Sequence, residues 1–227
     1  MATYVMSDIH GEKDRFDEML KKIGFSSKDE LYILGDVIDR GPDGVALLRQ
    51  IMAKYNIHML LGNHEDMCLK ANAPDATFDD IYRWGRNGSD PTVEALDQLR
   101  QKQLDEILLY LQELPTHLEL EVGGVKYYLV HAFPGDNVHD EVWFRPVPDT
   151  PNPKPDHRVI LGHTPVYILE RPREEIMAYL QQLQSDGDHV RIYLGENFIN
   201  LDCGCGHEIP GKALACLRLD DMAEFYV

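Results

Sequence analysis

The sequence predicts an α/β fold, because strand-like and helix-like segments alternate in its N-terminal third. Short apolar runs at residues 3–7, 31–34 and 57–61 have the length and composition of buried strands. Between these runs, apolar residues recur every three or four positions, which is the spacing of an amphipathic helix. The order strand, helix, strand, helix, strand favours a parallel sheet with right-handed crossovers.

The helices of this region are placed by their apolar spacing and their first residues. The first is expected at residues 14–23 and the second at residues 42–54, where Pro42 suits the first turn of a helix. A third helix is expected to begin near Glu65. The polar residues between each strand and the next helix therefore lie at strand ends, where open α/β sheets bind ligands.

The remainder of the chain departs from this alternation. A polar, helix-rich insertion is expected over about residues 72–115, with an amphipathic helix at residues 92–113, and we expect it to cap the site. Antiparallel strands should follow, starting with a hairpin around Gly123-Gly124. The expected later elements are hairpin strands at 118–122 and 125–131, a proline-rich loop at 146–155, a strand ending at His163, a helix at 173–184, and strands near 190–193, 198–201, 214–219 and 223–227.

Length and charge limit the organisation and the partners of the chain. The 227 residues are expected to form a single domain, residues 1–227. The formal net charge of −17 argues against a general affinity for nucleic acid, because phosphate backbones repel acidic surfaces. A phosphorylated substrate must therefore meet local positive charge from metal ions or arginines. The sequence has neither a leader nor a run that could span a membrane, so a cytoplasmic location is expected. The oligomeric state stays open.

The four cysteines show no CxxC pair, so neither a zinc ribbon nor a disulfide framework is indicated. We interpret Cys203-Gly-Cys205 as structural.

Four strand-like runs end in the same kind of polar turn. They lead into Asp8 and His10, into Asp36, into Asn63 and into His163. Side chains two positions apart on an extended segment point the same way, so Asp8 and His10 can converge on one object. Oxygen and nitrogen donors without a thiolate favour manganese, iron, zinc or magnesium. The strand ends therefore predict a site for divalent metal ions.

His131 follows the apolar run at residues 127–130 and offers a sixth group, although a core histidine is the alternative. Six groups exceed what one catalytic ion needs when it also holds water, so two ions are expected, with Asp36 as the bridging carboxylate. Two ions about 3.5–4 Å apart can activate a shared water and stabilise both ends of an in-line displacement at phosphorus.

Neighbouring residues are candidates for proton transfer and phosphate binding. Because Asn63 and His64 are adjacent and must diverge, His64 is expected to face the substrate as a general acid. Asp39 is placed to orient its ring. Arg40 and Arg145 can bind phosphate oxygens in bidentate fashion. The alternative for Asp39 and Arg40 is a structural salt bridge.

In these motifs the sequence resembles the metallophosphoesterases of the PPP serine/threonine phosphatase type, and within them the compact bacterial and bacteriophage-lambda-like protein phosphatases. The matching motifs are Asp8-Ile-His10-Gly, Gly35-Asp36-Val-Ile-Asp39-Arg40-Gly41, Gly62-Asn63-His64-Glu65, His131 and Gly162-His163. The resemblance spans about residues 8–164. It implies the calcineurin-like metallophosphoesterase fold, a central β-sandwich of mixed sheets flanked by helices, and two divalent ions, most commonly manganese.

The resemblance also implies roles for individual residues. It implies one ion held by Asp8, His10 and Asp36, a second held by Asp36, Asn63, His131 and His163, a catalytic pair of His64 with Asp39, and phosphate binding by Arg40 and Arg145.

Residues 84–89 resemble the family's Trp-x-x-Asn-Gly-Gly segment, with Ser89 in place of the second glycine. Trp84 and Asn87 are therefore expected on the substrate side, together with Asn63. From the residues alone, Trp84 and Trp143 are more typical of a core.

A sister group with the same core motifs hydrolyses symmetrical dinucleoside tetraphosphates, and its motif usually continues with Asp where this chain has Glu65. The leading hypothesis is therefore a two-metal phosphoprotein phosphatase acting on phosphoserine, phosphothreonine or phosphotyrosine. The alternatives are a symmetrical dinucleoside tetraphosphate hydrolase and, from another class, a catalytically silent metal-bound recognition module.

Overall fold

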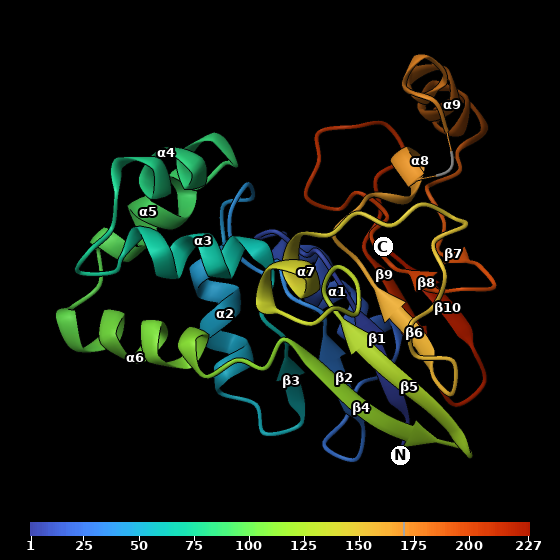
Figure 1. Cartoon of the computed structure of the whole chain (residues 1–227), viewed down its shortest axis with the longest axis horizontal. Coiled ribbons are helices and arrows are strands. Elements are labelled where there is room, and N and C mark those ends of the chain that lie inside the picture. Colours follow the sequence, from blue (N-terminus) through green and yellow to red (C-terminus); the bar gives the residue numbers. More distant parts are fainter. Residues whose placement is uncertain (170) are drawn as a thin grey trace.

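The strands of the protein form two five-stranded sheets, shown in a computed structural model that describes every residue except residue 170 (Figure 1). The first sheet has the order β10-β9-β1-β2-β3 and the second the order β4-β5-β6-β8-β7. The strands are β1 (Thr3–Met6), β2 (Glu30–Ile33), β3 (Ile57–Met59), β4 (His117–Val122), β5 (Val125–Val130), β6 (Arg158–Leu161), β7 (Tyr193–Leu194), β8 (Ile199–Asn200), β9 (Ala215–Arg218) and β10 (Ala223–Tyr226).

Both sheets are mixed. In the first, β1, β2 and β3 are parallel, and β9 and β10 are antiparallel additions. In the second, β5, β6 and β8 are parallel, with β4 and β7 antiparallel at the edges. The parallel sheet expected from the N-terminal third is confirmed. The antiparallel arrangement expected after the hairpin is wrong for β5, β6 and β8, because long links containing helices return the chain to the edge where each strand began.

The helices lie mainly around the sheets, and α3 to α6 gather on one side of them (Figure 1). They are α1 (Lys13–Lys22), α2 (Gly44–Met52), α3 (Asn63–Ala71), α4 (Phe78–Arg86), α5 (Asp90–Asp97), α6 (Gln101–Gln112), α7 (Val138–Trp143), α8 (Val166–Leu169) and α9 (Arg173–Asp186). The single amphipathic helix expected at residues 92–113 is in fact α5 and α6, separated by a turn. The sequence did not predict α7 and α8, because four to six residues are too few to show a helical repeat.

The two sheets pack against each other through an apolar core. Val5 of β1 and Leu217 of β9 belong to the same buried cluster as Leu129 of β5 and Ile160 of β6, and all four are fully buried. A second cluster covers the opposite face of the first sheet, where Phe16 of α1 packs. The expected sandwich of mixed sheets flanked by helices is therefore confirmed, and it holds the strand ends in fixed positions.

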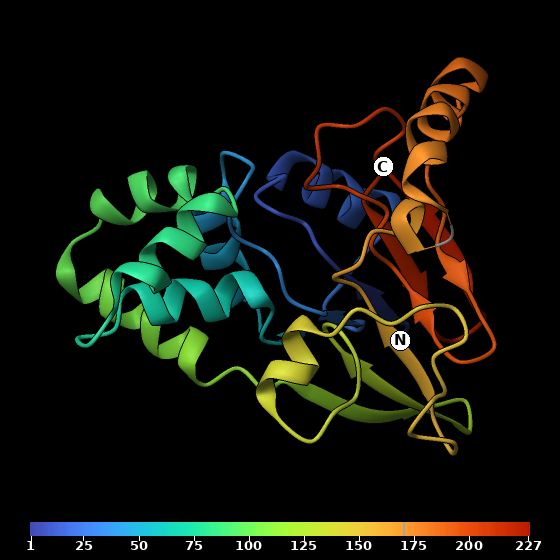
Figure 2. The ribbon, with the colours of Figure 1, turned by 45° about the horizontal axis from the view of Figure 1, so that its top comes forward.

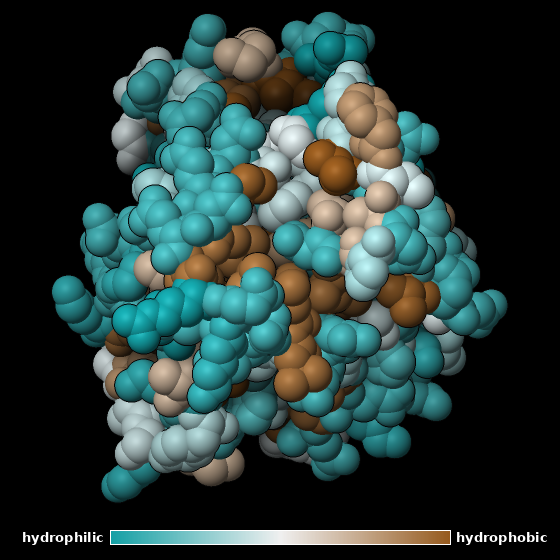
Figure 3. All heavy atoms as spheres, turned by 90° about the vertical axis from the view of Figure 1, so that its left-hand side faces the viewer, coloured by the Kyte–Doolittle hydropathy of each residue, from teal (hydrophilic) through white to brown (hydrophobic). Residues whose placement is uncertain are grey.

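The termini and the last long helix lie away from the helical side. Figure 2 shows α9 projecting on the opposite side of the sheets from α3 to α6. The surface of the helical side is largely hydrophilic, with apolar side chains gathered near its middle (Figure 3). Among the helices described, none combines the length and the apolar character that crossing a bilayer would require.

Candidate metal centre and catalytic site

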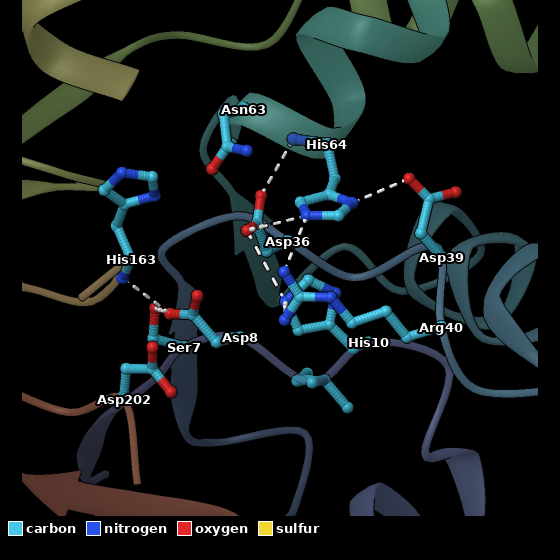
Figure 4. A network of polar contacts seen from close by, with 12 residues as sticks. Ser7, Asp8, His10, Asp36, Asp39, Arg40, Asn63, His64, His163 and Asp202 are labelled. Carbon is cyan, nitrogen blue, oxygen red and sulfur yellow. Dashed lines mark hydrogen bonds and ion pairs between the residues drawn. The ribbon is translucent and has the colours of Figure 1, made fainter. Parts of the chain in front are cut away.

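The carboxyl ends of five strands meet at one edge of the sandwich. β1, β2 and β3 of the first sheet, and β5 and β6 of the second, are each followed by a loop or helix start that carries expected site residues. Parallel strands end at the same edge, so the side chains that follow them converge there (Figure 4). The residues brought together, each no more than 5% exposed, are Asp8, His10, Asp36, Asn63, His64, His131 and His163.

The backbone of these loops adopts conformations that side chains disfavour. Of the seven described non-glycine residues with positive φ, six belong to this site: Asp8, His10, Asp36, Asp39, Arg40 and His163. Each such residue costs roughly 1–3 kcal/mol unless its surroundings fix it. Hydrogen bonds between the loops fix these residues. The His10 amide donates to the Asp36 carbonyl at 2.9 Å, and the Arg40 amide donates to the Gly88 carbonyl at 2.8 Å.

Glu65 ties the loop after β2 to the loop after β3. Its Oε2 accepts the amides of Asp36 at 2.8 Å and Gly62 at 3.1 Å, and its Oε1 accepts those of Val37 at 2.9 Å and Ile38 at 3.3 Å. Burial and the nearby charge of Asp36 raise the pKa of Glu65 to about 7, against the opposing effect of the amide donors. Glu65 thus fixes the position of Asp36 and does not face the substrate side.

Three histidines each direct one ring nitrogen at a backbone carbonyl. His131 Nδ1 lies 2.7 Å from the Leu34 carbonyl, and His10 Nδ1 lies 3.1 Å from the Ile38 carbonyl. His163 Nε2 lies 3.2 Å from the Trp143 carbonyl. A carbonyl oxygen can only accept, so these nitrogens carry the proton and the other ring nitrogen keeps a lone pair. This arrangement orients histidines that bind metals.

Asp36 lies among the histidine ring nitrogens that keep a lone pair. Its Oδ2 is 3.5 Å from His10 Nε2, and its Oδ1 is 3.4 Å from His131 Nε2. Two groups of donor atoms, each spanning less than 4.8 Å, share this residue: His10, Asp36 and His64 form one, and Asp36, His131 and His163 the other. Asp36 is the one residue that the two groups share, and its bridging of two ions stays a prediction.

Asn63 and Asp8 lie at the margins of the two groups. Asn63 Oδ1 is 2.9 Å from His131 Nε2, so it lies beside the second group. Asp8 belongs to neither group, because its Oδ2 accepts hydrogen bonds from Ser7 Oγ and, at 3.0 Å, from the His163 amide. Burial and the charge of Asp36 raise the pKa of Asp8.

The residues present fit two divalent cations. Buried carboxylates and oriented imidazoles around one shared carboxylate offer hard and intermediate donors, and no thiolate lies among them. Burial alone would raise the pKa of Asp36, but the neighbouring histidines His131, His64 and His10 lower it below its usual range. The carboxylate is therefore ionised and ready to bind a cation.

His64 is held differently from the other histidines. Its Nδ1 is 2.7 Å from Asp39 Oδ2, and the indole Nε1 of Trp84 donates to the same oxygen at 2.8 Å. Burial lowers the pKa of His64, but the charge of Asp36 and the hydrogen bond with Asp39 outweigh this effect and raise the pKa above its usual value. A carboxylate that orients and charges an imidazole is the arrangement of a general acid.

The two expected phosphate-binding arginines lie beside these groups. The Arg40 guanidinium lies 3.1 Å from Nε2 of His64, 3.0 Å from Nε2 of His10 and 3.0 Å from Nε2 of His207. Asp39 pairs with His64, so the salt bridge considered for Asp39 and Arg40 is not what the structure shows. Arg145 donates to the His163 carbonyl at 3.2 Å, which places it next to the second group.

Two expected substrate contacts are not brought into the site. Trp84 is only 4% exposed and its single N–H is bonded to Asp39, so it supports the catalytic pair from behind and does not contact the substrate. The side-chain amide of Asn87 donates to the Arg83 carbonyl at 2.8 Å, at the end of α4. Asn87 therefore caps its own helix.

Sequence reasoning missed several residues that shape the site. His207 is outside the motifs found in the sequence, yet it contacts Arg40 because the loop after β8 crosses the strand ends. The course of this loop depends on close packing that the sequence does not reveal, since a Cβ at Gly206 would lie 2.3 Å from His10 Cδ2. Asp202, which is buried next to Asp8 (Figure 4), was also missed. Burial and the charge of Asp8 raise the pKa of Asp202 well above its usual value.

Comparison with known proteins agrees with this geometry. The family model described as calcineurin-like phosphoesterase matches residues 1–203. The chain therefore belongs to the calcineurin-like phosphoesterase family, whose members are metal-dependent hydrolases of phosphate esters.

Two relatives of this chain have different named activities. A symmetrical bis(5'-nucleosyl)-tetraphosphatase of Acidovorax sp. (strain JS42) is 38% identical over 134 residues, which is 58% of this chain and 44% of that protein. Serine/threonine-protein phosphatase 2 of Escherichia coli (strain K12) is 34% identical over 134 residues, which is 58% of this chain and 59% of that protein. The match thus spans about half the length of these relatives.

A solved structure described as a putative diadenosine tetraphosphatase superimposes with a TM-score of 0.63. The superposition covers 100% of this chain and 92% of that one, at 16% sequence identity. At this identity the likeness supports the fold alone.

Proposed function

We propose that this protein hydrolyses symmetrical dinucleoside tetraphosphates with the help of two divalent ions, manganese being the first to test. The observation that carries the proposal is the 38% identity to a symmetrical bis(5'-nucleosyl)-tetraphosphatase. Glu65, the residue that favoured a phosphoprotein phosphatase, does not distinguish the two substrates, because its carboxylate bonds to four backbone amides and is fully buried.

The chain's own residues supply substrate binding and proton transfer. Bound ions would provide a nucleophile derived from water and offset the charge of the reacting phosphate. Arg40 and Arg145 bind the non-bridging oxygens. Because the Arg40 guanidinium lies 3.1 Å from His64 Nε2, a phosphate held by Arg40 is within reach of that nitrogen. Asp39 holds the ring through Nδ1 and leaves Nε2 to deliver the proton.

The proposed reaction balances with water as the only co-reactant. The water oxygen bonds to one of the two central phosphorus atoms, and the P–O bond to the central bridging oxygen breaks. His64 gives its proton to that leaving oxygen and is reprotonated by the proton released from water. The products are two nucleoside diphosphates.

A second candidate function, phosphoprotein hydrolysis, is favoured by the His64–Asp39–Trp84 arrangement. A serine alkoxide is a far more basic leaving group than a diphosphate, so it depends more strongly on a general acid. The 34% identity to a serine/threonine-protein phosphatase points the same way.

The two functions are separated by kcat/KM for diadenosine tetraphosphate and for a phosphoserine peptide, measured with manganese, zinc, iron and magnesium in turn. We expect a preference of at least tenfold for the nucleotide. A preference for the peptide would overturn the proposal in favour of the phosphatase. Failure to hydrolyse either substrate, or p-nitrophenyl phosphate, with any of the four metals would favour the catalytically silent recognition module. The intact His64–Asp39 pair argues against that module.

A further inference from the structure

A cavity of about 390 Å³ opens beside the metal centre, between α3, α4 and α7. It is lined by Asp66, Lys70, Arg83, Val138, His139 and Trp143. The catalytic roles assigned above use none of these side chains. The volume falls in the range of small-molecule sites, about 300–1,000 Å³.

Each wall of the cavity is continuous with the catalytic site. The helix α3 that carries Lys70 begins with Asn63 and His64. The helix α4 that carries Arg83 also carries Trp84, which bonds to Asp39. Short stretches of helix therefore fix the position of the cavity relative to His64 and to the Trp84–Asp39 contact.

The third wall, α7, contacts a metal-binding residue directly. The carbonyl of Trp143 bonds to His163 Nε2 at 3.2 Å, and the two ring centroids are 6.1 Å apart. The ring of His139 lies 6.5 Å from the indole of Trp143 at an angle of 87°. Two neighbouring aromatic rings thus line the cavity, and one of them lies beside His163.

The cavity also carries positive charge in a chain whose formal charge is −17. Lys70 is neutralised locally, because its Nζ lies 2.6 Å from Asp66 Oδ2. Arg83 is different: its guanidinium forms no ion pair with the part of the chain that the structure describes. An unpaired guanidinium next to aromatic rings suits a planar ligand that bears phosphates.

We infer that this cavity is the subsite for one nucleoside diphosphate half of the substrate, with the base against Trp143 and His139 and the phosphates at Arg83. This inference rests on the proposed function and extends it, since it assigns the recognition of the nucleotide to residues outside the metal centre. Stacking of a base on an aromatic side chain and a charged contact to phosphate add affinity for this half without touching the bond that breaks.

The experiment compares Arg83→Ala and His139→Ala with the unchanged protein, loaded with manganese. Both side chains are exposed, so neither change should disturb folding. For Arg83→Ala we expect KM for diadenosine tetraphosphate to rise about tenfold, with a much smaller change in KM for p-nitrophenyl phosphate. Inhibition by ADP should weaken to a similar extent, while inhibition by inorganic phosphate should change little.

Arg86→Ala is the matched control, because it removes the same charge from the same helix outside the cavity. Arg86 lies over Tyr82, with its guanidinium carbon 5.8 Å from the ring centroid. This control should leave all four constants unchanged. Equal changes for the nucleotide and for p-nitrophenyl phosphate, or none in Arg83→Ala, would overturn the subsite.

Binding of ADP, measured by calorimetry, separates this inference from the proposed function. If the protein hydrolyses diadenosine tetraphosphate but Arg83→Ala binds ADP as tightly as the unchanged protein, the subsite is wrong and the function stands. If the protein hydrolyses no dinucleotide yet binds ADP in an Arg83-dependent way, the function is wrong and the subsite stands. If Arg83→Ala raises KM for a phosphopeptide and leaves ADP binding unchanged, the cavity binds a peptide and the inference is wrong.

Discussion

The Nδ1 atom of His64 lies 2.7 Å from Oδ2 of Asp39, and both side chains are closed to solvent. The pair is separate from the histidines that donate to backbone carbonyls, so one set of imidazoles is suited to bind ions and another to move a proton. Trp84 adds a second donor to the same Asp39 oxygen at 2.8 Å. Through Trp84, the helical insertion thereby contacts the His64–Asp39 pair directly.

Replacing His64 by Asn should remove the general acid and keep the metal-binding residues. We expect kcat to fall by roughly 10²–10⁴-fold. The loss should be larger for phenyl phosphate than for p-nitrophenyl phosphate, because phenolate is the more basic leaving group. Kinetics with both esters, together with elemental analysis, would test this, with His58→Asn as a control far from the centre. Equal losses on the two esters would argue against proton donation by His64.

Replacing Trp84 by Phe should show that the indole positions the catalytic pair. The change removes one donor to Asp39, whose other oxygen, Oδ1, is already buried without a partner. We expect kcat to fall roughly tenfold or more, as for other outer contacts of a site, with little change in KM. Asp39 would become more basic and hold the proton of His64 more tightly, so the basic limb of the kcat–pH profile should move to higher pH.

Tyr82→Phe, an exposed change on the same helix, serves as the control for Trp84. A fall in kcat that is uniform across pH would mean that Trp84 acts only through folding.

Much of the first sheet was predictable from sequence, because each of its parallel strands is a short apolar run followed directly by a helix. The second sheet was harder. Whether β5, β6 and β8 run parallel depends on the path of the links between them, and those links are irregular loops and short helices without a clear repeat. The break between α5 and α6 was missed for a related reason, since apolar spacing continues across the turn.

The convergence of the candidate metal ligands could be predicted, because these residues follow strands whose ends must meet. His207 and Asp202 could not, because they come from a loop whose course over the centre is set by packing of Gly206 against His10. The role of Trp84 could not be predicted from the sequence either. Its apolar surroundings and its bond to Asp39 arise only when α4 packs onto the first sheet.

Replacing Glu65 by Gln should loosen the loop that carries Asp36. An amide group offers one acceptor oxygen where the carboxylate offers two, so two of the four backbone amides would lose their partner. We expect unfolding to become easier by roughly 1.5–3 kcal/mol, together with weaker retention of metal. Urea unfolding and elemental analysis after dialysis would measure both. Glu113→Gln, an exposed change on the helical side, is the control, and an equal stability of the two variants would contradict the role assigned to Glu65.

Glu141 should make stability depend on pH from a position outside the metal centre. Its carboxylate accepts hydrogen bonds from Thr116, from the Tyr128 hydroxyl at 2.7 Å and from His117 at 3.1 Å, which fastens α7 to the second sheet. Burial alone would raise the pKa of Glu141, but the bonds from Thr116, Tyr128 and His117 prevail and lower it below its ordinary value of 4.5.

Because the folded-state pKa of Glu141 is depressed, its contribution to stability is present above about pH 4.5 and is lost as the pH falls through the folded value. At pH 7, Glu141→Gln should lower the free energy of unfolding by roughly 1–2 kcal/mol. The difference from the unchanged protein should shrink steadily below pH 4.5, since the unchanged protein is losing the same charge. Urea unfolding at several pH values measures this difference, and Glu121→Gln on the exposed face of β4 is the control. A difference that stays constant from pH 7 to low pH would mean that Glu141 stabilises α7 by packing and not by its charge.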